Sequence, residues 1–328
     1  MVVTTPPLAG SDLLSIADLA RSDIEAVLEL AARTKAGDDL GRPLAGRNLA
    51  LIFQRPSNRT RVSFEVAVTR LGGHPIAIHA QEIQIGERES VADVSRILDR
   101  YADGIVARLI SHRDLLRMAQ FSASPVINAM TDREHPCQVL ADCLTVREAT
   151  GRLAGARVCY VGDGNNVCTS WLYAAGLCGV DFRMVCPPGY EPQGDVLERA
   201  AAMAAASGGR LHVGHEAAPA LEDAEIIYTD VWTSMGQEGE QQRRREDFAR
   251  LQVNESLVTM APPQARVMHC LPAHRGEEIT DAVIDGPQSI VFDQAENRLW
   301  VQQALLALIF ADPPRPATAA TAALEARR

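Results

Sequence analysis

Short apolar runs alternate with helix-like stretches along most of this chain, and this alternation constrains the fold more than any other feature. Residues 47–53 form an apolar run typical of a buried strand. Residues 60–71 then have helical spacing and end at Gly72-Gly73. Because strand and helix alternate in this way, the sequence predicts an α/β fold with parallel sheets flanked by helices.

The same pattern predicts the remaining elements and two domains. Further strands are expected at 74–80, 104–110, 125–128, 156–162, 181–186, 224–228, 266–268 and 289–292. Helices are expected at 12–35, 137–150, 169–178 and 298–310. The pattern restarts after Gly155, so we predict one domain at 1–148, joined by a C-terminal helix at 298–311, and a second at 149–297. Interdomain helices link them, and the Pro- and Ala-rich tail at 312–328 is expected to be disordered.

Composition argues against several classes of function. The formal net charge of −10 gives no basic face for nucleic acid, and the basic run 243–245 is expected to be a solvated surface. No segment approaches the ~18 continuous apolar residues of a membrane span, and the first residues lack the pattern of a signal peptide. Seven cysteines without a CxxC pair indicate reduced thiols. We therefore expect a cytoplasmic protein that binds neither nucleic acid nor membrane.

A turn rich in hydroxyls and arginines follows the first predicted strand. Ser57-Asn58-Arg59-Thr60-Arg61 leads into a helix, and Ser57 is the expected N-cap. The free N–H groups of a helix start, its positive dipole end and arginine side chains together suit a phosphate dianion. An ordinary capped helix with surface arginines explains these residues equally well.

His135 and Gln138 form a second candidate pair. They lie three residues apart and share one helical face, and Pro136 fits the first turn of that helix. Such a pair can hydrogen-bond a carbonyl oxygen or orient an amide. A capping pair or a core histidine is the competing interpretation.

Asp230 follows the strand at 224–228 and precedes Ser234-Met235-Gly236. A carboxylate at a strand end, followed by this loop, could hold an ammonium group and close over it. A loop of ordinary turn residues is the alternative.

Cys270 follows another predicted strand, in the sequence His269-Cys270-Leu271-Pro272. Its thiol and a neighbouring backbone carbonyl can lie near a reacting amine. A cysteine nucleophile would need a positioned base, whereas His269 is expected to point to the other face of the strand. A metal site made of His269, Cys270 and His274 lacks a second ligand pair at zinc spacing, so no metal is predicted.

Gly162-Asp-Gly164-Asn165-Asn166-Val167 comes close to a dinucleotide fingerprint. Val167 stands at the third glycine position, and a lone fingerprint is weak support. No cofactor is predicted, and Asn165 and Asn166 suit a small polar ligand instead.

The ordered motifs SNRTR, HPCQ, GDGNN, DVWTSMG and HCLP resemble those of the aspartate/ornithine carbamoyltransferase family. The resemblance runs from about residue 14 to 307, and SMG with HCLP is similar to the ornithine branch. It implies transfer of a carbamoyl group from carbamoyl phosphate to the side-chain amine of L-ornithine, giving L-citrulline and phosphate in arginine biosynthesis. It also implies a homotrimer with active sites between subunits.

The resemblance assigns roles to matching residues. The first domain is expected to bind carbamoyl phosphate and the second ornithine. The expected carbamoyl-phosphate contacts are Ser57, Asn58, Arg59, Thr60, Gln84 (supplied by a neighbouring subunit), Arg108, His135, Gln138, Cys270, Leu271 and Arg298. The expected ornithine contacts are Asn166, Asp230, Ser234 and Met235. The expected catalytic residues are Arg59, Arg108, His135, Asp230 and Cys270.

Asn58 departs from the family motif, which most often has Thr there. Its backbone N–H remains, so phosphate binding should persist with a modest change in affinity. Two other functions stay open: transfer to another amine such as putrescine, or a non-catalytic relative that only binds carbamoyl phosphate.

Overall fold

Two parallel sheets organise the chain, which confirms the predicted α/β fold class. The computed structural model describes residues 8–79, 83–86, 88–234 and 238–311. The chain divides into two compact units, Met1–Leu140 with Arg298–Arg328 (unit 1) and Ala141–Asn297 (unit 2). The tail at 312–328 and Met235 lie outside the described residues, and so do the predictions made for them.

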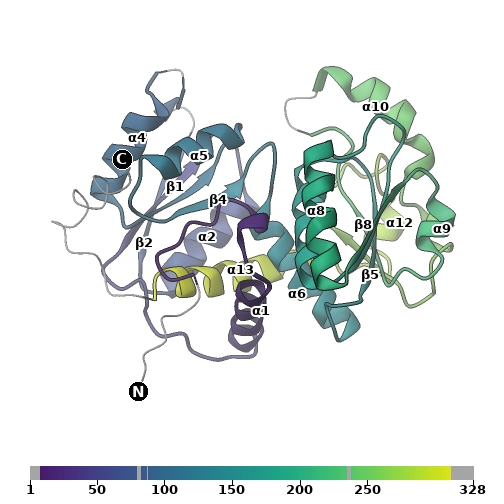
Figure 1. The fold of residues 1–328 in the computed structure, drawn as a ribbon, viewed down its shortest axis with the longest axis horizontal. Helices are drawn as coiled ribbons and strands as arrows, with labels where there is room; N and C mark the ends of the chain where they lie inside the picture. Colours follow the sequence, from purple (N-terminus) through teal and green to yellow (C-terminus); the bar gives the residue numbers. More distant parts are fainter. Residues whose placement is uncertain (1–7, 80–82, 87, 235–237, 312–328) are drawn as a thin grey trace. The chain divides into compact units, whose positions relative to one another are not determined.

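Unit 1 contains a four-stranded parallel sheet in the order β2-β1-β3-β4. Its strands are β1 (Asn48–Phe53), β2 (His74–His79), β3 (Gly104–Arg108) and β4 (Val126–Met130). Its helices are η1 (Ile16–Asp18), α1 (Arg21–Lys35), α2 (Arg59–Arg70), α4 (Val91–Tyr101) and α5 (His112–Gln120). In Figure 1, α4 and α5 lie on one side of β1, and α1 lies on the other. β1 is buried along nearly its whole length because both of its faces are covered.

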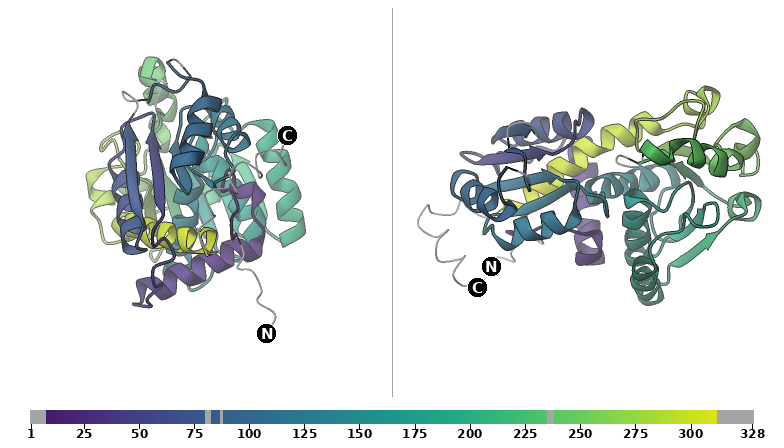
Figure 2. Two further views of the ribbon diagram at one scale, coloured as in Figure 1. Left: turned by 90° about the vertical axis from the view of Figure 1, so that its left-hand side faces the viewer. Right: turned by 90° about the horizontal axis from the view of Figure 1, so that it is seen from above.

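Unit 2 contains a five-stranded parallel sheet in the order β7-β6-β5-β8-β9. Its strands are β5 (Arg157–Val161), β6 (Asp181–Val185), β7 (Arg210–Gly214), β8 (Ile226–Thr229) and β9 (Arg266–His269). Its helices are α7 (Asn166–Cys178), α8 (Gly194–Ser207), α9 (Ala217–Leu221), η2 (Glu238–Glu240), α10 (Gln241–Phe248), η3 (Ala249–Leu251), α11 (Glu255–Val258) and α12 (Asp281–Ile284). α8 lies on one side of β5 and β8, and α9 and α12 lie on the other, as Figures 1 and 2 show.

The chain passes between the units within two helices, α6 (Pro136–Thr150) and α13 (Val291–Ile309). No helix in the described part of the chain combines the length and the apolar character needed to cross a membrane.

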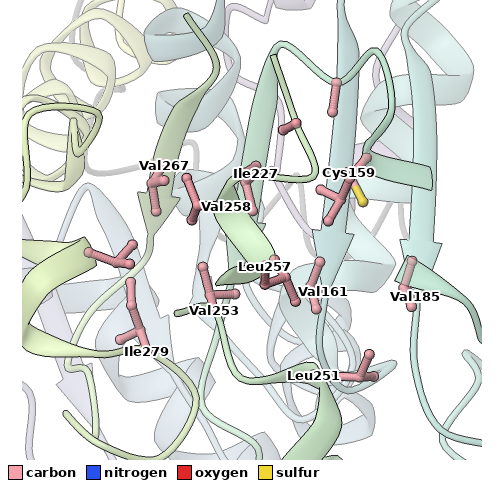
Figure 3. Close-up of a cluster of buried hydrophobic side chains, with 14 of the residues drawn as sticks. Cys159, Val161, Val185, Ile227, Leu251, Val253, Leu257, Val258, Val267 and Ile279 are labelled. Carbon is pink, nitrogen blue, oxygen red and sulfur yellow. The ribbon is translucent and has the colours of Figure 1, made fainter. Parts of the chain in front are cut away.

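The two faces of the unit 2 sheet bury different kinds of side chain. Cys159 and Val161 of β5 join an aliphatic cluster with Ile227 and Val267, drawn in Figure 3. On the opposite face, aromatic rings meet: Tyr160 stacks on Tyr228 with ring centroids 5.5 Å apart, and Trp171 stacks on Phe182 at 5.7 Å. This alternation follows from the two-residue period of a strand, and it positions the strand ends that carry the functional side chains.

Two predicted elements were wrong, and one strand was missed. The helix expected from residue 12 begins at Arg21, because Leu13 pairs with Ile127 in a bridge and Ser15 caps the short helix η1. The strand expected at 289–292 is a single bridge from Ser289 to Val267, and α13 begins at Val291. Strand β7 was not predicted, because this half-exposed edge strand lacks a continuous apolar run.

Candidate active site

The turn after β1 presents an uncapped helix start. α2 begins at Arg59 with Asn58 as its N-cap, and the Asn58 side chain makes no capping hydrogen bond. The prediction that Ser57 caps this helix was therefore wrong by one position. The first N–H groups of a helix have no partner inside the helix, so this turn keeps the anion-binding character expected of it.

Thr60 is the meeting point of two arginines from distant parts of the sequence. Its side chain is buried, and its Oγ1 accepts hydrogen bonds from Arg298 Nη2 at 2.6 Å and from Arg108 Nη1 at 3.4 Å. A hydroxyl that accepts two N–H groups still has its own O–H to donate. Thr60 thus holds two positive charges in place and can itself donate to an anion.

Three arginine charges act on His135. Burial lowers the pKa of His135 well below its usual value, and the charges of Arg298, Arg108 and Arg59 lower it further. His135 is therefore a neutral imidazole near pH 7. Arg59 Nε is buried without a hydrogen-bond partner among the described residues. A neutral donor beside three guanidinium groups suits a small anion that carries a carbonyl group.

Gln138 and Gln84 differ in their surroundings. Gln138 is buried in the first turn of α6, together with His135 at the start of that helix. Gln84 is exposed on the loop between β2 and α4 and has a φ of 41°, in the left-handed region. Arg88 N–H donates to Gln84 O at 3.0 Å. The exposed amide is accessible to another chain.

Asp230 is the centre of a hydrogen-bond network in unit 2. It directly follows β8 and is buried. Its Oδ2 accepts from Asn165 Nδ2 at 2.7 Å, and its Oδ1 accepts from Cys270 Sγ at 2.9 Å and from Val231 N–H at 2.8 Å. Three donors from three segments therefore fix the orientation of this carboxylate.

The sequence indicated Asn165 only as a possible contact to a small polar ligand, and its structural role was missed. Its Oδ1 caps α7 by accepting from the N–H groups of Val167 at 2.9 Å and Cys168 at 3.1 Å. The amide nitrogen must then face Asp230, so Asn165 joins a helix start to the carboxylate. An asparagine between a strand and a helix is a favoured N-cap, and this signal could have identified it.

His269 supports the turn at Cys270 and is not a catalytic base. Its Nδ1 accepts from Leu271 N–H at 2.8 Å, so its Nε2 carries the proton and donates to Glu278 at 3.1 Å. Both ring nitrogens are engaged, which argues against a Cys–His nucleophile. His274 also binds this carboxylate, through its backbone N–H at 2.6 Å.

The expectation that His269 points away from Cys270 was wrong. A ring nitrogen of His269 lies within 4.8 Å of the Cys270 sulfur and of an Asp230 oxygen. β9 ends at His269, and Leu271 has a φ of 56°, so the alternation of a strand no longer applies here.

The remaining predicted ornithine contacts lie near these groups in sequence. Asn166 begins α7 and is half-buried, as is Ser234. Leu271 is partly buried against the aliphatic cluster of unit 2.

Arg244 corrects the interpretation of the basic run as a solvated surface. It is buried and pairs with Asp163 at 3.0 Å, and its Nη1 donates to Trp232 O at 2.9 Å. Burial raises the pKa of Asp163 to about 6, while the charge of Arg244 acts in the opposite direction. This pair ties the GDGNN turn to the loop that contains Asp230 and Ser234.

Comparisons with known proteins agree with this arrangement. The family model of the aspartate/ornithine carbamoyltransferase carbamoyl-P binding domain matches residues 11–148, and that of the Asp/Orn binding domain matches residues 154–309. An ornithine carbamoyltransferase of Thermococcus kodakarensis is 48% identical over 305 residues, covering 92% of this chain and 97% of the relative. An anabolic ornithine carbamoyltransferase of Pyrococcus furiosus is 50% identical over 305 residues, with coverage of 92% and 97%.

Solved structures show the same similarity. The structure of ornithine carbamoyltransferase from Pyrococcus furiosus has a TM-score of 0.90 at 49% identity, covering 93% of this chain and 99% of that one. The enzyme from Gloeobacter violaceus has a TM-score of 0.84 at 43% identity, covering 92% and 99%. This chain belongs to the aspartate/ornithine carbamoyltransferase family.

Proposed function

We propose that this protein transfers the carbamoyl group of carbamoyl phosphate to the side-chain amine of L-ornithine, giving L-citrulline and phosphate. The observation that carries the proposal is the group around Thr60 and His135, where three arginines act on one neutral imidazole. The relatives named ornithine carbamoyltransferase support ornithine as the acceptor.

Carbamoyl phosphate binds to unit 1 in this proposal. Its phosphate lies at the start of α2, where Ser57, Asn58, Arg59 and Thr60 supply backbone and side-chain donors. The uncapped first turn and the positive end of the helix dipole favour a dianion there. Asn58 contributes its backbone N–H, which does not depend on the side chain that replaces the usual Thr.

The carbonyl oxygen of the carbamoyl group is held by charged and neutral donors. His135, Arg108 and Arg298 stabilise the negative charge that develops on this oxygen when the amine attacks. Burial and the three arginine charges keep His135 neutral, so it can donate one N–H to this oxygen. Gln138 orients the carbamoyl amide, and Arg59 also contacts the phosphate.

Ornithine binds to unit 2 through its amino-acid end. Asp230 anchors the α-ammonium group, and its orientation is set by Asn165 and Cys270. Asn166, Ser234 and Met235 complete the contacts to that end of the substrate. Cys270 and Leu271 contribute a thiol and a backbone carbonyl to the reacting amine.

The reaction step follows from these assignments. The neutral side-chain amine attacks the carbamoyl carbon, the C–O bond to phosphate breaks, and phosphate leaves as an anion held by Arg59 and the helix start. The departing phosphate accepts the amine proton. Orientation of two bound substrates supplies much of the acceleration.

We also propose a homotrimer in which Gln84 of one subunit reaches the phosphate site of its neighbour. The exposed position of Gln84 supports this assignment. Light scattering of the purified protein should give a mass of three chains. Mixing inactive Gln84→Ala and Arg59→Ala proteins should restore part of the activity, because some sites then combine two intact halves. A monomer, or no restoration after subunit exchange, would contradict the proposal.

The first experiment is citrulline formation by the purified protein with carbamoyl phosphate and one of four acceptors: ornithine, putrescine, N-acetylornithine or aspartate. The anchored Asp230 favours a free α-ammonium, so ornithine alone should react. Carbamoylation of putrescine instead would overturn the role of Asp230. Binding of carbamoyl phosphate without any turnover would support the non-catalytic alternative.

Arg59→Ala should lower kcat/KM by roughly 10²–10³-fold, the usual cost of removing a donor to a developing charge. Arg61→Ala is the matched control, since Arg61 lies on the same helix but pairs with Glu65 at 3.1 Å. Circular dichroism should be unchanged in both variants. Similar activity of the two variants would sink the assignment of the phosphate site.

A further inference from the structure

Three potential metal ligands meet in unit 2 at the ends of two adjacent strands. Cys186 directly follows β6, and His215 directly follows β7. Glu191 lies on the loop from β6 to α8. One ligand atom from each residue lies within 4.8 Å of the other two. None of these residues takes part in the network around Asp230 described above.

The hydrogen bonding of His215 leaves one ring nitrogen suited to a cation. Its Nδ1 lies 2.9 Å from the backbone oxygen of Cys186. A carbonyl oxygen can only accept, so Nδ1 carries the hydrogen and Nε2 of the neutral ring has a lone pair. Nε2 lies 3.7 Å from Glu191 Oε1. A lone pair and a carboxylate oxygen repel each other unless a proton or a metal cation lies between them.

The other two ligands are also held in place. Glu191 Oε2 accepts from Gly189 N–H at 2.9 Å, which leaves Oε1 directed at His215. Cys186 N–H donates to Gly214 O at 3.1 Å and joins the two strand ends. Ligands in protein metal sites are typically oriented by such outer hydrogen bonds, often from a histidine N–H to a backbone carbonyl.

We propose that Cys186, Glu191 and His215 bind a divalent cation of the zinc class, with Sγ, one carboxylate oxygen and Nε2 as ligands. Thiolate, imidazole and carboxylate are the donor types that zinc takes, and three protein ligands leave a fourth position for water. Magnesium and calcium prefer sites made only of oxygen, so the thiol argues against them.

The cluster is open to a metal on one side. Cys186 is buried, whereas the side chains of His215 and Glu191 are 46% and 36% exposed. Burial raises the pKa of the Cys186 thiol to about 12. Metal uptake therefore displaces one proton from sulfur to solvent as the metal–thiolate bond forms.

A bound metal would stiffen a loop that supports the ornithine contacts. The loop after β6 packs on the GDGNN turn, where Gly164 N–H donates to Tyr190 O at 2.9 Å. A Cβ at Gly164 would lie 2.5 Å from the backbone nitrogen of Pro192, so the two segments touch closely. Asn165, which orients Asp230, is the next residue. The proposed role of the metal is structural, since it would hold this loop against the GDGNN turn.

The competing interpretation is an exposed His–Glu ion pair beside an inert buried cysteine, which forms no metal–thiolate bond. Titration with Co²⁺ separates the two, because a cobalt–thiolate bond has an intense charge-transfer absorption in the near ultraviolet. The protein should carry Cys270→Ser throughout, since Asp230, His269 and Cys270 form a second group within ligand distance.

Cys270→Ser protein should bind one Co²⁺ with thiolate absorption, and Zn²⁺ should displace it and raise the unfolding temperature. Adding His215→Ala should weaken binding by more than the roughly 10–100-fold that loss of an outer hydrogen bond costs. His212→Ala is the matched control, because His212 is exposed on β7 but outside the cluster. It should bind normally.

Two further variants test the individual ligands. Cys186→Ser should abolish the thiolate absorption, and Glu191→Gln, at an exposed position, should weaken binding without affecting folding. Absence of a thiolate band in Cys270→Ser protein would overturn the proposal. So would equal affinity of the His215→Ala and His212→Ala proteins.

Discussion

At the scale of single residues, Thr60 shows how one hydroxyl can fix the positions of two arginine side chains. The bond from Arg298 to Thr60 joins residues 238 positions apart, and the bond from Arg108 joins residues 48 apart. The family resemblance assigned all three residues to the carbamoyl-phosphate site. It did not indicate that Thr60 holds the two arginines, because this contact depends on where the fold places Arg298 within α13 and Arg108 at the end of β3.

Thr60→Val should raise the KM for carbamoyl phosphate by about 10–100-fold, because hydrogen bonds to charged groups contribute roughly 1.5–3 kcal/mol. The substitution keeps the volume but removes the acceptor and the donor. Steady-state kinetics measure the effect, and Thr60→Ser should restore most of the affinity. An unchanged KM in Thr60→Val would show that the hydroxyl does not organise this site.

His135 should remain neutral well below pH 6.5, because burial and three arginines lower its pKa. Imidazole resonances in NMR spectra should therefore show no protonation of His135 at pH 6. Arg59→Ala removes one of these charges, so it should move the pKa of His135 upward. A midpoint near 6.5 in the wild-type protein would contradict this electrostatic picture.

At the scale of elements, the start of α7 links local helix stability to substrate binding. The GDGNN turn resembles a nucleotide-binding motif in sequence. In the structure, the side-chain oxygen of Asn165 caps α7 and its side-chain nitrogen donates to Asp230. One side chain thus serves two purposes. Replacing Asn165 with a smaller residue that can still cap the helix should keep the cap but remove the contact with Asp230.

Asn165→Ala should destabilise the fold by about 1 kcal/mol through the lost N-cap, and it should raise the KM for ornithine. Asn165→Ser keeps a capping hydroxyl but cannot reach Asp230, so its stability should be near wild type while its KM for ornithine stays high. Thermal unfolding and kinetics together measure the two effects. Normal ornithine affinity in both variants would rule out a positioning role.

At the scale of the whole molecule, buried charges make stability depend on pH. Asp163 has its pKa raised from 3.8 to about 6 by burial, so the folded state holds this proton more tightly than the unfolded chain does. Between about pH 4 and 6 the folded state binds more protons, and stability falls as pH rises through this window.

The stability of wild type minus that of Asp163→Asn should therefore decrease by about 2 kcal/mol between pH 4 and pH 7, at 1.36 kcal/mol per pKa unit, because the unfolded chain is already partly ionised at pH 4. Denaturant unfolding at several pH values measures this difference. A difference that is flat, or that rises with pH, would mean that Arg244 outweighs burial at this site.

The sequence by itself determined the fold class and most element positions, because strand and helix periodicities are local properties of the chain. β1 and β5 were predicted closely because their apolar runs are nearly continuous, and α6 was predicted closely because Pro136 marks its first turn. The five motifs, in order, indicated the family and the reaction. The apolar pattern did not reveal the edge strand β7, because exposed polar residues interrupt that strand.

Only the tertiary structure decided which side chains share a site and in what state. The burial of Arg244 and the contact of Asn165 with Asp230 depend on segments far apart in sequence. The tautomer of His269 depends on the turn at Leu271, which strand periodicity does not specify. The meeting of Cys186, Glu191 and His215 depends on β6 and β7 being neighbours. Periodicity records which face of an element is buried. It does not record which strand ends come together, and that pairing sets the charges, hydrogen bonds and desolvation at each site.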